Sequence, residues 1–368
     1  MTNHNPNVLI AGAGASQAIF GNRFTNPDVM PLGVQPDVTF YDPNPAVKLR
    51  DDMPYLRAGM MDGRVKLVHT LPDETFDIAV VATASDRHAA ATKAILDHHS
   101  EPPFFIFEKP VAATREDLAW FQGIEPQVQS RSLVNEPYFF LESLRNLVSK
   151  ARNQTEAESP LTEVCVWSSK KRAKANPHGE LGIYAIELPH THGAASWIAD
   201  EVLDLSNVQE NVYFADVQGV KDNDGNYMRF EVDGVAYHVA QGLGAFVMDR
   251  YGSMLAHQDP PRTRRVAMGF ADGSSTVLDV DPAFPFTQSQ RPPEVALYHY
   301  DIPDGEPATS VIADDPRSDL VRHAVERVLN LAEPAPGVSL GESLARNQAL
   351  LDLRASAEIR RGVAIAAA

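Results

Sequence analysis

The stretch Val8-Leu-Ile-Ala-Gly-Ala-Gly-Ala-Ser-Gln17 decides the fold of the N-terminal part of this chain. It begins with an apolar run, Val8–Ala11, that predicts a buried strand, and two glycines follow within three residues. Ser16–Arg23 then has helical spacing. A strand, a glycine-rich turn and a helix in this order form the context in which proteins bind dinucleotides. The alternative is an ordinary strand-to-helix turn that happens to contain two glycines.

The residues of this turn have separate expected tasks. Gly12 is expected to give the tight turn, and Gly14 to let the backbone approach a pyrophosphate at the helix N-terminus. Gln17 replaces the third glycine of the usual pattern, so we expect a helix shifted slightly from the sheet or a redirected phosphate contact. The predicted cofactor contacts in the turn are Gly12, Gly14, Ala15 and Ser16.

Short apolar runs alternate with helical segments from Asn7 to about Asn135. Strands that are apolar throughout are typical of a parallel sheet with helices on both faces. The predicted strands are Val8–Ala11, Val38–Tyr41, Ile78–Ala82, Phe104–Phe107 and Val128–Val134; the predicted helices are Ser16–Arg23, Arg87–His98 and Thr114–Phe121.

Polar residues follow two of these strands. Asp42 ends the second strand, where a carboxylate accepts hydrogen bonds from the adenosine ribose and repels a 2′-phosphate, so NAD is expected rather than NADP. The alternative makes Asp42 a turn residue. Thr83 and Ser85 follow the Ile78–Ala82 strand and are expected beside the nicotinamide, although Ser85 also suits a helix cap. His88, one turn into the next helix, is expected either there or in a structural role.

Glu108-Lys109-Pro110 closes the apolar run Phe104–Phe107. A lysine at the carboxyl end of a buried parallel strand lies where open α/β sheets bind ligands. A low dielectric and a nearby positive charge move a lysine pKa toward neutrality, which suits proton transfer. Lys109 is therefore the candidate catalytic residue, with Glu108 beside it at the cofactor.

Beyond Tyr138 the pattern changes to alternating segments separated by turns such as Asp233-Gly234 and Asp272-Gly273, which predict a mostly antiparallel sheet. Two helices, about 317–332 and 340–360, end the chain. The predicted fold is an α/β Rossmann domain, residues 1–136, followed by an α+β domain, residues 137–368, with a large open sheet. Because few helices remain to cover that sheet, we expect a homodimer or homotetramer formed through its face.

Glu187-Leu-Pro-His190 is the second candidate for chemistry. A carboxylate three residues before a histidine shares its helix face and raises the basicity of the ring, which suits a substrate hydroxyl. A structural role is the alternative. No metal is expected, because His190 and His192 lack the His-Glu-x-x-His spacing. The cationic run that contains Lys171 and Arg172 is expected to attract an anionic substrate, or else to be a solvated loop.

Composition limits the classes of partner. A formal net charge of −17 over 368 residues argues against nucleic acid. The single cysteine, Cys165, excludes an internal disulfide framework and a multi-cysteine zinc site. No apolar stretch approaches the roughly 20 residues that span a bilayer, so no membrane partner is expected. The polar N-terminus lacks the features of a secretory signal, so a cytoplasmic location is expected by default.

These residues together resemble the glucose–fructose oxidoreductase, inositol dehydrogenase and rhizopine-catabolism (Gfo/Idh/MocA) family. The likeness covers nearly the whole chain. The stretches that carry it are Val8–Gly14, Phe76–Thr83 with His88, Phe107–Ala112, Val134–Tyr138, His190–Ile198 and the C-terminal helices.

The resemblance implies that Lys109 is the catalytic lysine, that His190 is the catalytic histidine and that the bond before Pro110 is cis. It also implies that Asn135 and Tyr138 contact the substrate. The family usually has an aspartate four residues before its histidine. Ile186 stands there in this chain, and Glu187 is the nearest substitute.

The expected activity is NAD-dependent oxidation of a secondary alcohol on a sugar, a cyclitol or a sugar derivative, including phosphorylated and nucleotide-linked ones. In this reaction Lys109 and His190 would transfer the hydroxyl proton. One alternative is a redox-neutral enzyme that retains NAD, such as an epimerase, lyase or glycosidase. Another is a non-catalytic sensor that keeps the cofactor fold.

Overall fold

The computed structural model describes residues 5–124, 126–157, 159–170, 188–199, 209–213, 225–243, 246–248, 254–256, 263–280, 294–300, 307–333 and 338–360. The chain divides into two units. Met1–Phe140 and Pro316–Gln348 belong to the first, and Leu141–Pro177, Leu181–Asp315 and Ala349–Ala368 belong to the second. The division after Phe140 lies four residues beyond the predicted boundary. Residues 316–348, which were expected in the second domain, cluster with the first unit.

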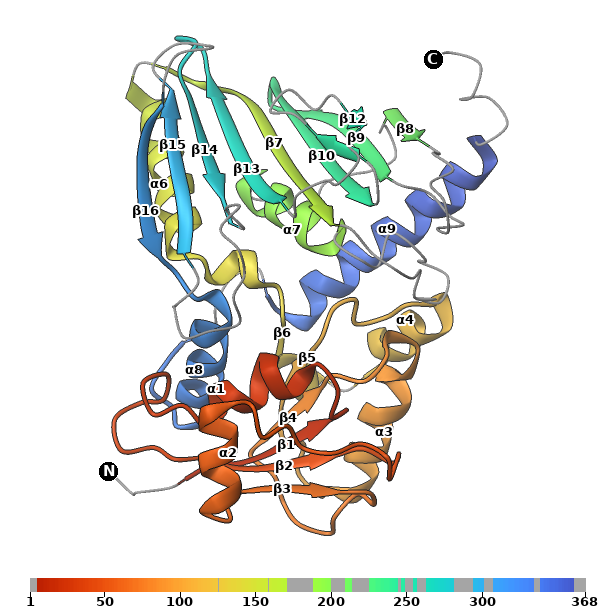
Figure 1. The fold of residues 1–368 in the computed structure, drawn as a ribbon. Coiled ribbons are helices and arrows are strands. Elements are labelled where there is room, and N and C mark those ends of the chain that lie inside the picture. The colour runs from red at the N-terminus through yellow and green to blue at the C-terminus, as the bar shows by residue number, and fades with distance from the viewer. Residues whose placement is uncertain are drawn as a thin grey trace. The chain divides into compact units, whose positions relative to one another are not determined.

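The first unit contains a six-stranded sheet in the order β3-β2-β1-β4-β5-β6, and every neighbouring pair is parallel (Figure 1). The direction of strand addition reverses between β1 and β4, and ligands bind at the carboxyl ends of strands at such a point. The strands are β1 Asn7–Ala11, β2 Asp37–Tyr41, β3 Val65–Val68, β4 Ile78–Val81, β5 Phe104–Phe107 and β6 Ser132–Val134.

Helices connect these strands and return from the end of the chain. Buried apolar residues of β1, β4 and β5 form the centre of the core. Helix α8 comes from the C-terminal part of the chain and contacts β4 and β5. The helices of the unit are η1 Gln17–Gly21, α1 Asn22–Phe24, α2 Pro54–Met61, η2 Ser85–Arg87, α3 His88–His98, α4 Arg115–Gln122, α5 Pro126–Ser130, η3 Pro137–Phe140 and α8 Pro316–Val328, with the first part of α9 Leu340–Arg360.

One predicted strand of this unit is wrong in its first half. Val128 was expected in a strand that ran to Val134. The structure instead has helix α5 over Pro126–Ser130 and strand β6 over Ser132–Val134. Pro126 at the start favours a helix, since its fixed φ suits a first helical position. Val128 is buried from the helix.

The second unit contains an eight-stranded sheet in the order β16-β15-β14-β13-β7-β10-β9-β8. Only the β7–β10 pair is parallel, so the expected mostly antiparallel sheet is confirmed. Helices α6 and α7 pack on β7. The elements are α6 Glu142–Ala157, β7 Leu161–Lys170, α7 Leu188–Ala199, β8 Gln209–Tyr213, β9 Gly225–Val232, β10 Val235–Leu243, β11 Phe246–Met248, β12 Met254–Ala256, β13 Thr263–Phe270, β14 Ser275–Asp279, β15 Glu294–Tyr300 and β16 Ala308–Ala313, of which β11 and β12 form a separate pair.

The predicted turn between β9 and β10 is present. Asp233 and Gly234 have φ of 50° and 80°, so both have the positive φ that a two-residue hairpin of type I′ requires.

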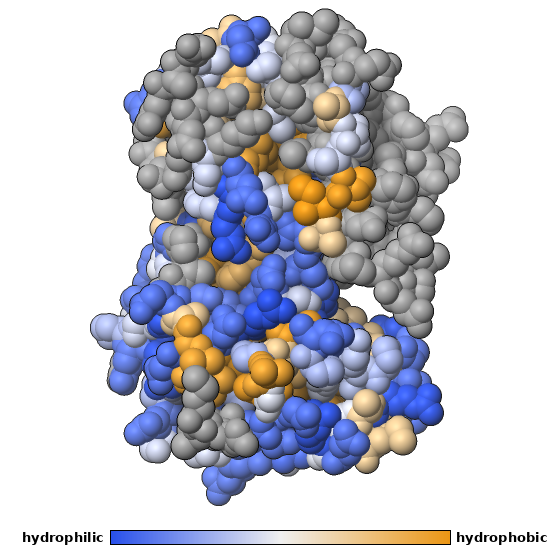
Figure 2. Space-filling view, turned by 90° about the vertical axis from the view of Figure 1, so that its left-hand side faces the viewer, coloured by the Kyte–Doolittle hydropathy of each residue, from blue (hydrophilic) through white to orange (hydrophobic). Residues whose placement is uncertain are grey.

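The assembly prediction assumed that a face of this sheet is left uncovered by helices. The burial of its strands differs from that assumption. Neighbouring residues of β7 point to opposite faces, yet Val164, Cys165, Val166 and Trp167 are all at most 3% exposed. In contrast, every residue of β16 is exposed. The large hydrophobic residues exposed among the described ones are Leu32, Met61, Val311, Ile312 and Leu331. On the face shown in Figure 2, the coloured apolar residues appear as separate groups among hydrophilic ones. Association through the sheet face stays a prediction.

None of the helices in the described ranges is long and apolar enough to cross a membrane.

Candidate functional site

The glycine turn, residues 12–17, follows β1 and lies against the end of β4. Gly12 has φ of +98°, and a Cβ added there would lie 2.6 Å from the carbonyl oxygen of Ala82. Its N–H donates to the Tyr41 carbonyl of β2 at 2.8 Å. Only glycine fits this position, which confirms the expected tight turn. The turn is therefore attached to the carboxyl ends of β2 and β4.

Gly14 faces open space. A Cβ added there would meet nothing within 4 Å. Within the part of the chain that the structure describes, neither Gly14 nor Ala15 donates its N–H to another residue. Successive backbone N–H groups in a turn are suited to an anion. The turn therefore fits the pyrophosphate of a dinucleotide.

Asp42 holds the turn and also shapes its own loop. One carboxylate oxygen accepts a hydrogen bond from the Ala13 N–H at 3.0 Å, and the other accepts from the Asn44 N–H at 3.0 Å. The second contact is an Asx turn, so the turn-residue interpretation of Asp42 applies. Each carboxylate oxygen can accept more than one hydrogen bond, so these contacts are compatible with additional ribose contacts.

The helix after the turn approaches the sheet closely through a different glycine. A Cβ added to Gly21 would lie 2.3 Å from Cζ of Phe40 on β2. In the dinucleotide pattern the third glycine provides such close helix–strand packing. In this chain Gln17 occupies that place, and the close approach is found four residues later. The helix itself begins as a π-helix over Gln17–Gly21, and Ser16 Oγ donates to the Gly12 carbonyl.

The residues after β4 contribute backbone and an internal histidine. His88 is 1% exposed, with Nε2 at 3.1 Å from the Thr83 carbonyl and Nδ1 at 3.3 Å from the Val111 carbonyl. Burial lowers its pKa, against the opposing effect of these carbonyls. This geometry favours the structural alternative for His88. Ser85 is buried and is the first residue of η2, while the N-cap positions of η2 and α3 are Ala84 and Arg87.

The lysine loop, residues 108–113, directly follows β5. The Glu108 N–H donates to the Val81 carbonyl of β4 at 2.9 Å, which joins the start of this loop to the strand beside the glycine turn. The Glu108 carboxylate accepts from the Lys109 N–H at 3.1 Å and from Asn135 Nδ2 at 2.6 Å. The bond between Lys109 and Pro110 is cis, as the resemblance implied. Lys109 therefore lies at the carboxyl end of β5, as expected.

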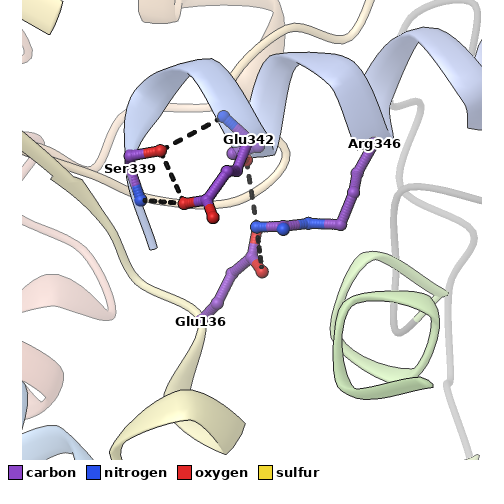
Figure 3. A network of polar contacts seen from close by, with 5 residues as sticks. Glu136, Ser339, Glu342 and Arg346 are labelled. Atoms are coloured by element: carbon purple, nitrogen blue, oxygen red, sulfur yellow. Dashed lines mark hydrogen bonds and ion pairs between the residues drawn. The ribbon is translucent and has the colours of Figure 1, made fainter. Parts of the chain in front are cut away.

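A buried ion pair holds the segment that contains Asn135. Glu136 Oε2 accepts from Arg346 Nη2 at 2.8 Å (Figure 3). Glu136 Oε1 accepts from Ser343 Oγ at 3.0 Å. The Glu136 and Arg346 side chains are 2% and 3% exposed. Burial raises the pKa of Glu136, while the Arg346 charge opposes this. Arg346 also lies over the Phe139 ring, 5.2 Å from its centroid.

Helix α9 supplies these partners from its first turns. Ser339 and Glu342 form a capping box at its start: the Ser339 N–H donates to Glu342 Oε2 at 3.1 Å, and the Glu342 N–H donates to Ser339 Oγ at 3.3 Å (Figure 3). Asn347, 1% exposed, bonds the lysine loop, since in its satisfied amide orientation Oδ1 accepts from the Ala112 N–H at 3.0 Å and the Val111 N–H at 3.2 Å.

Sequence reasoning missed Glu136, Arg346 and Asn347. The available signal was the Ser-x-x-Glu pattern at residue 339 followed by Ser343, Arg346 and Asn347, which are three and four residues apart and so share a helix face. A polar stripe on a helix is usually solvated. Here it is buried.

Of the site residues predicted beyond residue 136, only some lie within the described residues. His190 is 4% exposed on α7, a helix that contacts β7 and β10. Tyr138 lies in η3 of the first unit and is buried. Glu187, Lys171 and Arg172 lie outside the described residues. The first unit thus brings Gly12, Gly14, Asp42, Thr83, Glu108, Lys109 and Asn135 to the carboxyl ends of its strands, whereas His190 belongs to the second unit.

Comparisons with known proteins agree with this architecture. No family model matches the chain. No curated protein matches it. Three similar solved structures are a Gfo/Idh/MocA family oxidoreductase from Vibrio cholerae (12% identity, TM-score 0.63, covering 98% of this chain and 99% of that one), levoglucosan dehydrogenase in complex with NADH and levoglucosan (13%, 0.64, 96% and 98%), and a myo-inositol dehydrogenase from Corynebacterium glutamicum (14%, 0.63, 97% and 98%). The expected resemblance is thus confirmed for the fold, over nearly the full length of both chains.

Proposed function

We propose that this chain is an NAD-dependent oxidoreductase acting on a secondary alcohol of a sugar, a cyclitol or a related compound. The observation that carries the proposal is the position of Lys109. Its loop follows β5 directly, and that strand adjoins β4, whose end supports the glycine turn. A site for a dinucleotide and a proton-transfer group thus lie at neighbouring strand ends. Solved proteins of this fold include dehydrogenases of levoglucosan and myo-inositol, which supports the substrate class.

The glycine turn would hold the pyrophosphate through the N–H groups of Gly14 and Ala15. Asp42 would accept hydrogen bonds from the adenosine ribose hydroxyls. A 2′-phosphate would bring negative charge against this carboxylate, so NAD is proposed over NADP. Asp42 is well placed for this, because its Ala13 contact already joins it to the turn.

When bound, the nicotinamide ring supplies the hydride acceptor. Lys109 would take up and return the proton of the substrate hydroxyl, with its backbone held by the Glu108 carboxylate. His190 is proposed as a second proton-transfer group, on the strength of the family resemblance. Asn135 would orient the lysine loop through its bond to Glu108.

Two measurements on the purified chain test the proposal. Titration with NADH and NADPH, followed by nicotinamide fluorescence, should show tighter binding of NADH. Equal or tighter binding of NADPH would overturn the role of Asp42, and binding of neither would overturn the proposed function. A library of sugars, cyclitols and their phosphates should then contain a compound that reduces added NAD, seen as absorbance of NADH. Turnover without added NAD and without net NADH would instead indicate a redox-neutral reaction.

A further inference from the structure

Gln17 stands where the dinucleotide pattern has its third glycine. Both polar atoms of its side-chain amide make hydrogen bonds. It is 2% exposed. Its Nε2 donates to the Ala13 carbonyl at 2.5 Å and to the Lys48 carbonyl at 3.0 Å, and its Oε1 accepts from the Arg50 N–H at 2.7 Å. All polar atoms of the amide thus bond backbone groups. Gln17 joins the glycine turn to the loop after β2.

The contact with Ala13 determines the direction of a neighbouring group. The peptide between Ala13 and Gly14 is planar and trans, so its C=O and its N–H point in opposite directions. Gln17 fixes the carbonyl on the inner side. The Gly14 N–H is thereby turned away from the Gln17 side chain, and Gly14 itself is exposed.

Ala13 is held on its other side as well. Its N–H donates to the Asp42 carboxylate at 3.0 Å, so both backbone polar groups of this residue are bound by side chains. Neither peptide that flanks Ala13 can rotate without breaking such a bond. A turn fixed in advance loses less conformational entropy when it binds a ligand.

We propose that Gln17 is a positioning residue for the cofactor pyrophosphate. It holds the Ala13 carbonyl so that the N–H of Gly14, which belongs to the same peptide, is presented to the phosphate oxygens. The inference rests on the proposed binding of a dinucleotide and adds a residue-specific reason for the departure from the glycine pattern. The same amide ties the turn to Lys48 and Arg50, so the position of that loop and the phosphate contact are set by one side chain.

The test compares ligands that have a pyrophosphate with one that lacks it. Gln17→Met keeps the length and apolar volume and removes every hydrogen bond of the amide. It should weaken binding of NADH and ADP-ribose by about tenfold or more, the scale of a lost hydrogen bond to a charged group. Binding of adenosine, measured by competition, should change by less than about twofold. Gln129→Met, which removes a single side-chain bond to the Ile124 carbonyl in the same unit, is the matched control and should leave all three affinities unchanged.

The outcomes separate this inference from the proposed function. If the wild-type chain binds neither NADH nor NADPH, the proposed function fails. If the wild-type chain binds NADH and Gln17→Met binds it equally well, or loses adenosine affinity to the same degree, the positioning role is overturned.

A measurement on the wild-type chain covers the case in which Gln17→Met does not fold. Amide hydrogen exchange of a peptide that spans residues 12–16 should slow when ADP-ribose binds and should not slow with adenosine. Unchanged exchange in the presence of bound ADP-ribose would overturn the inference.

Discussion

The glycine turn and the lysine loop lie at neighbouring strand ends of one sheet but are held in different ways. The glycine turn is fixed by contacts of short range in the sequence: Gln17 bonds Ala13 four residues away, and Asp42 bonds it from 29 residues away. The lysine loop depends on α9, whose Asn347 bonds Ala112 from 235 residues away and whose Arg346 bonds Glu136 from 210 away. One region is organised mainly by its own chain segment, and the other by a distant helix.

The chemistry of the two supports also differs. The amide of Gln17 brings no charge to the place where an anion is expected to bind. Glu136 and Arg346 form an ion pair with almost no access to water, and such a pair costs much to break because one partner is left buried and uncompensated. We therefore expect damage to the glycine turn to change mainly cofactor affinity, and damage to the α9 contacts to change mainly stability.

The largest expected effect follows from breaking the ion pair. Arg346→Met leaves the Glu136 carboxylate buried without its cation and should lower the free energy of unfolding by about 3–5 kcal/mol. Thermal denaturation measures it. Replacing both partners, Glu136→Gln with Arg346→Met, should recover part of the loss because no unpaired charge remains.

The control for this variant is Arg57→Met, which removes an exposed arginine of α2 and should leave the melting temperature nearly unchanged. A double variant less stable than Arg346→Met alone would show that the pair is not the source of the effect.

The second effect concerns the chemistry of the lysine loop. Lys109→Met keeps the aliphatic volume and removes the ammonium group. Turnover of a substrate found by the polyol screen should fall by on the order of a hundredfold or more, whereas NADH affinity and melting temperature stay within experimental scatter. Lys93→Met, at an exposed position of α3, is the control. If Lys109→Met instead unfolds the chain and activity tracks the folded fraction, the lysine is a structural partner of a carboxylate such as Glu108.

This contrast also explains how far the sequence could be interpreted. The glycine turn, Asp42 and Lys109 were predictable because each is next to its strand, and the carboxyl ends of parallel strands meet at one edge. The partnership of Glu136 with Arg346 was not, because no local pattern links residues 210 positions apart. The burial of Val128 was predictable, but its secondary structure was not, because a single buried valine suits either a strand or a short helix that begins at a proline.

The position of Gln17 shows a different limit. The missing glycine was visible in the sequence, and a change in the phosphate contact was expected from it. The identity of the compensating residue, Gly21, and the bonds to Lys48 and Arg50 depend on where the loop after β2 lies. That position is a property of the folded unit.

Two glycine variants test whether stability and cofactor affinity depend on different residues of the glycine turn. Gly12→Ala forces a side chain into a left-handed conformation and against the Ala82 carbonyl, so it should lower stability by about 1–2 kcal/mol or more. Gly14→Ala meets nothing in the chain and should leave the melting temperature unchanged while weakening NADH binding. Equal effects of the two variants on melting temperature would contradict the assigned geometry.

The smallest effect concerns His88, whose ring nitrogens lie near the carbonyls of Thr83, after β4, and of Val111 in the lysine loop. Burial lowers the pKa of this ring below its ordinary value of 6.5. The unfolded chain therefore takes up a proton at a higher pH than the folded chain. The stability due to neutral His88 is fully present above pH 6.5 and is lost as the pH falls through the range below it, by at most about 1.4 kcal/mol per pH unit.

His88→Gln keeps an amide that can bond one carbonyl but cannot titrate. Denaturant unfolding between pH 7 and about pH 5 should thus show a shallower loss of stability for His88→Gln than for the wild-type chain. Ala94→Gln, at an exposed position of the same helix, changes no titratable group and should keep the wild-type slope. An unchanged slope in His88→Gln would mean that the ring titrates alike in the folded and unfolded chains.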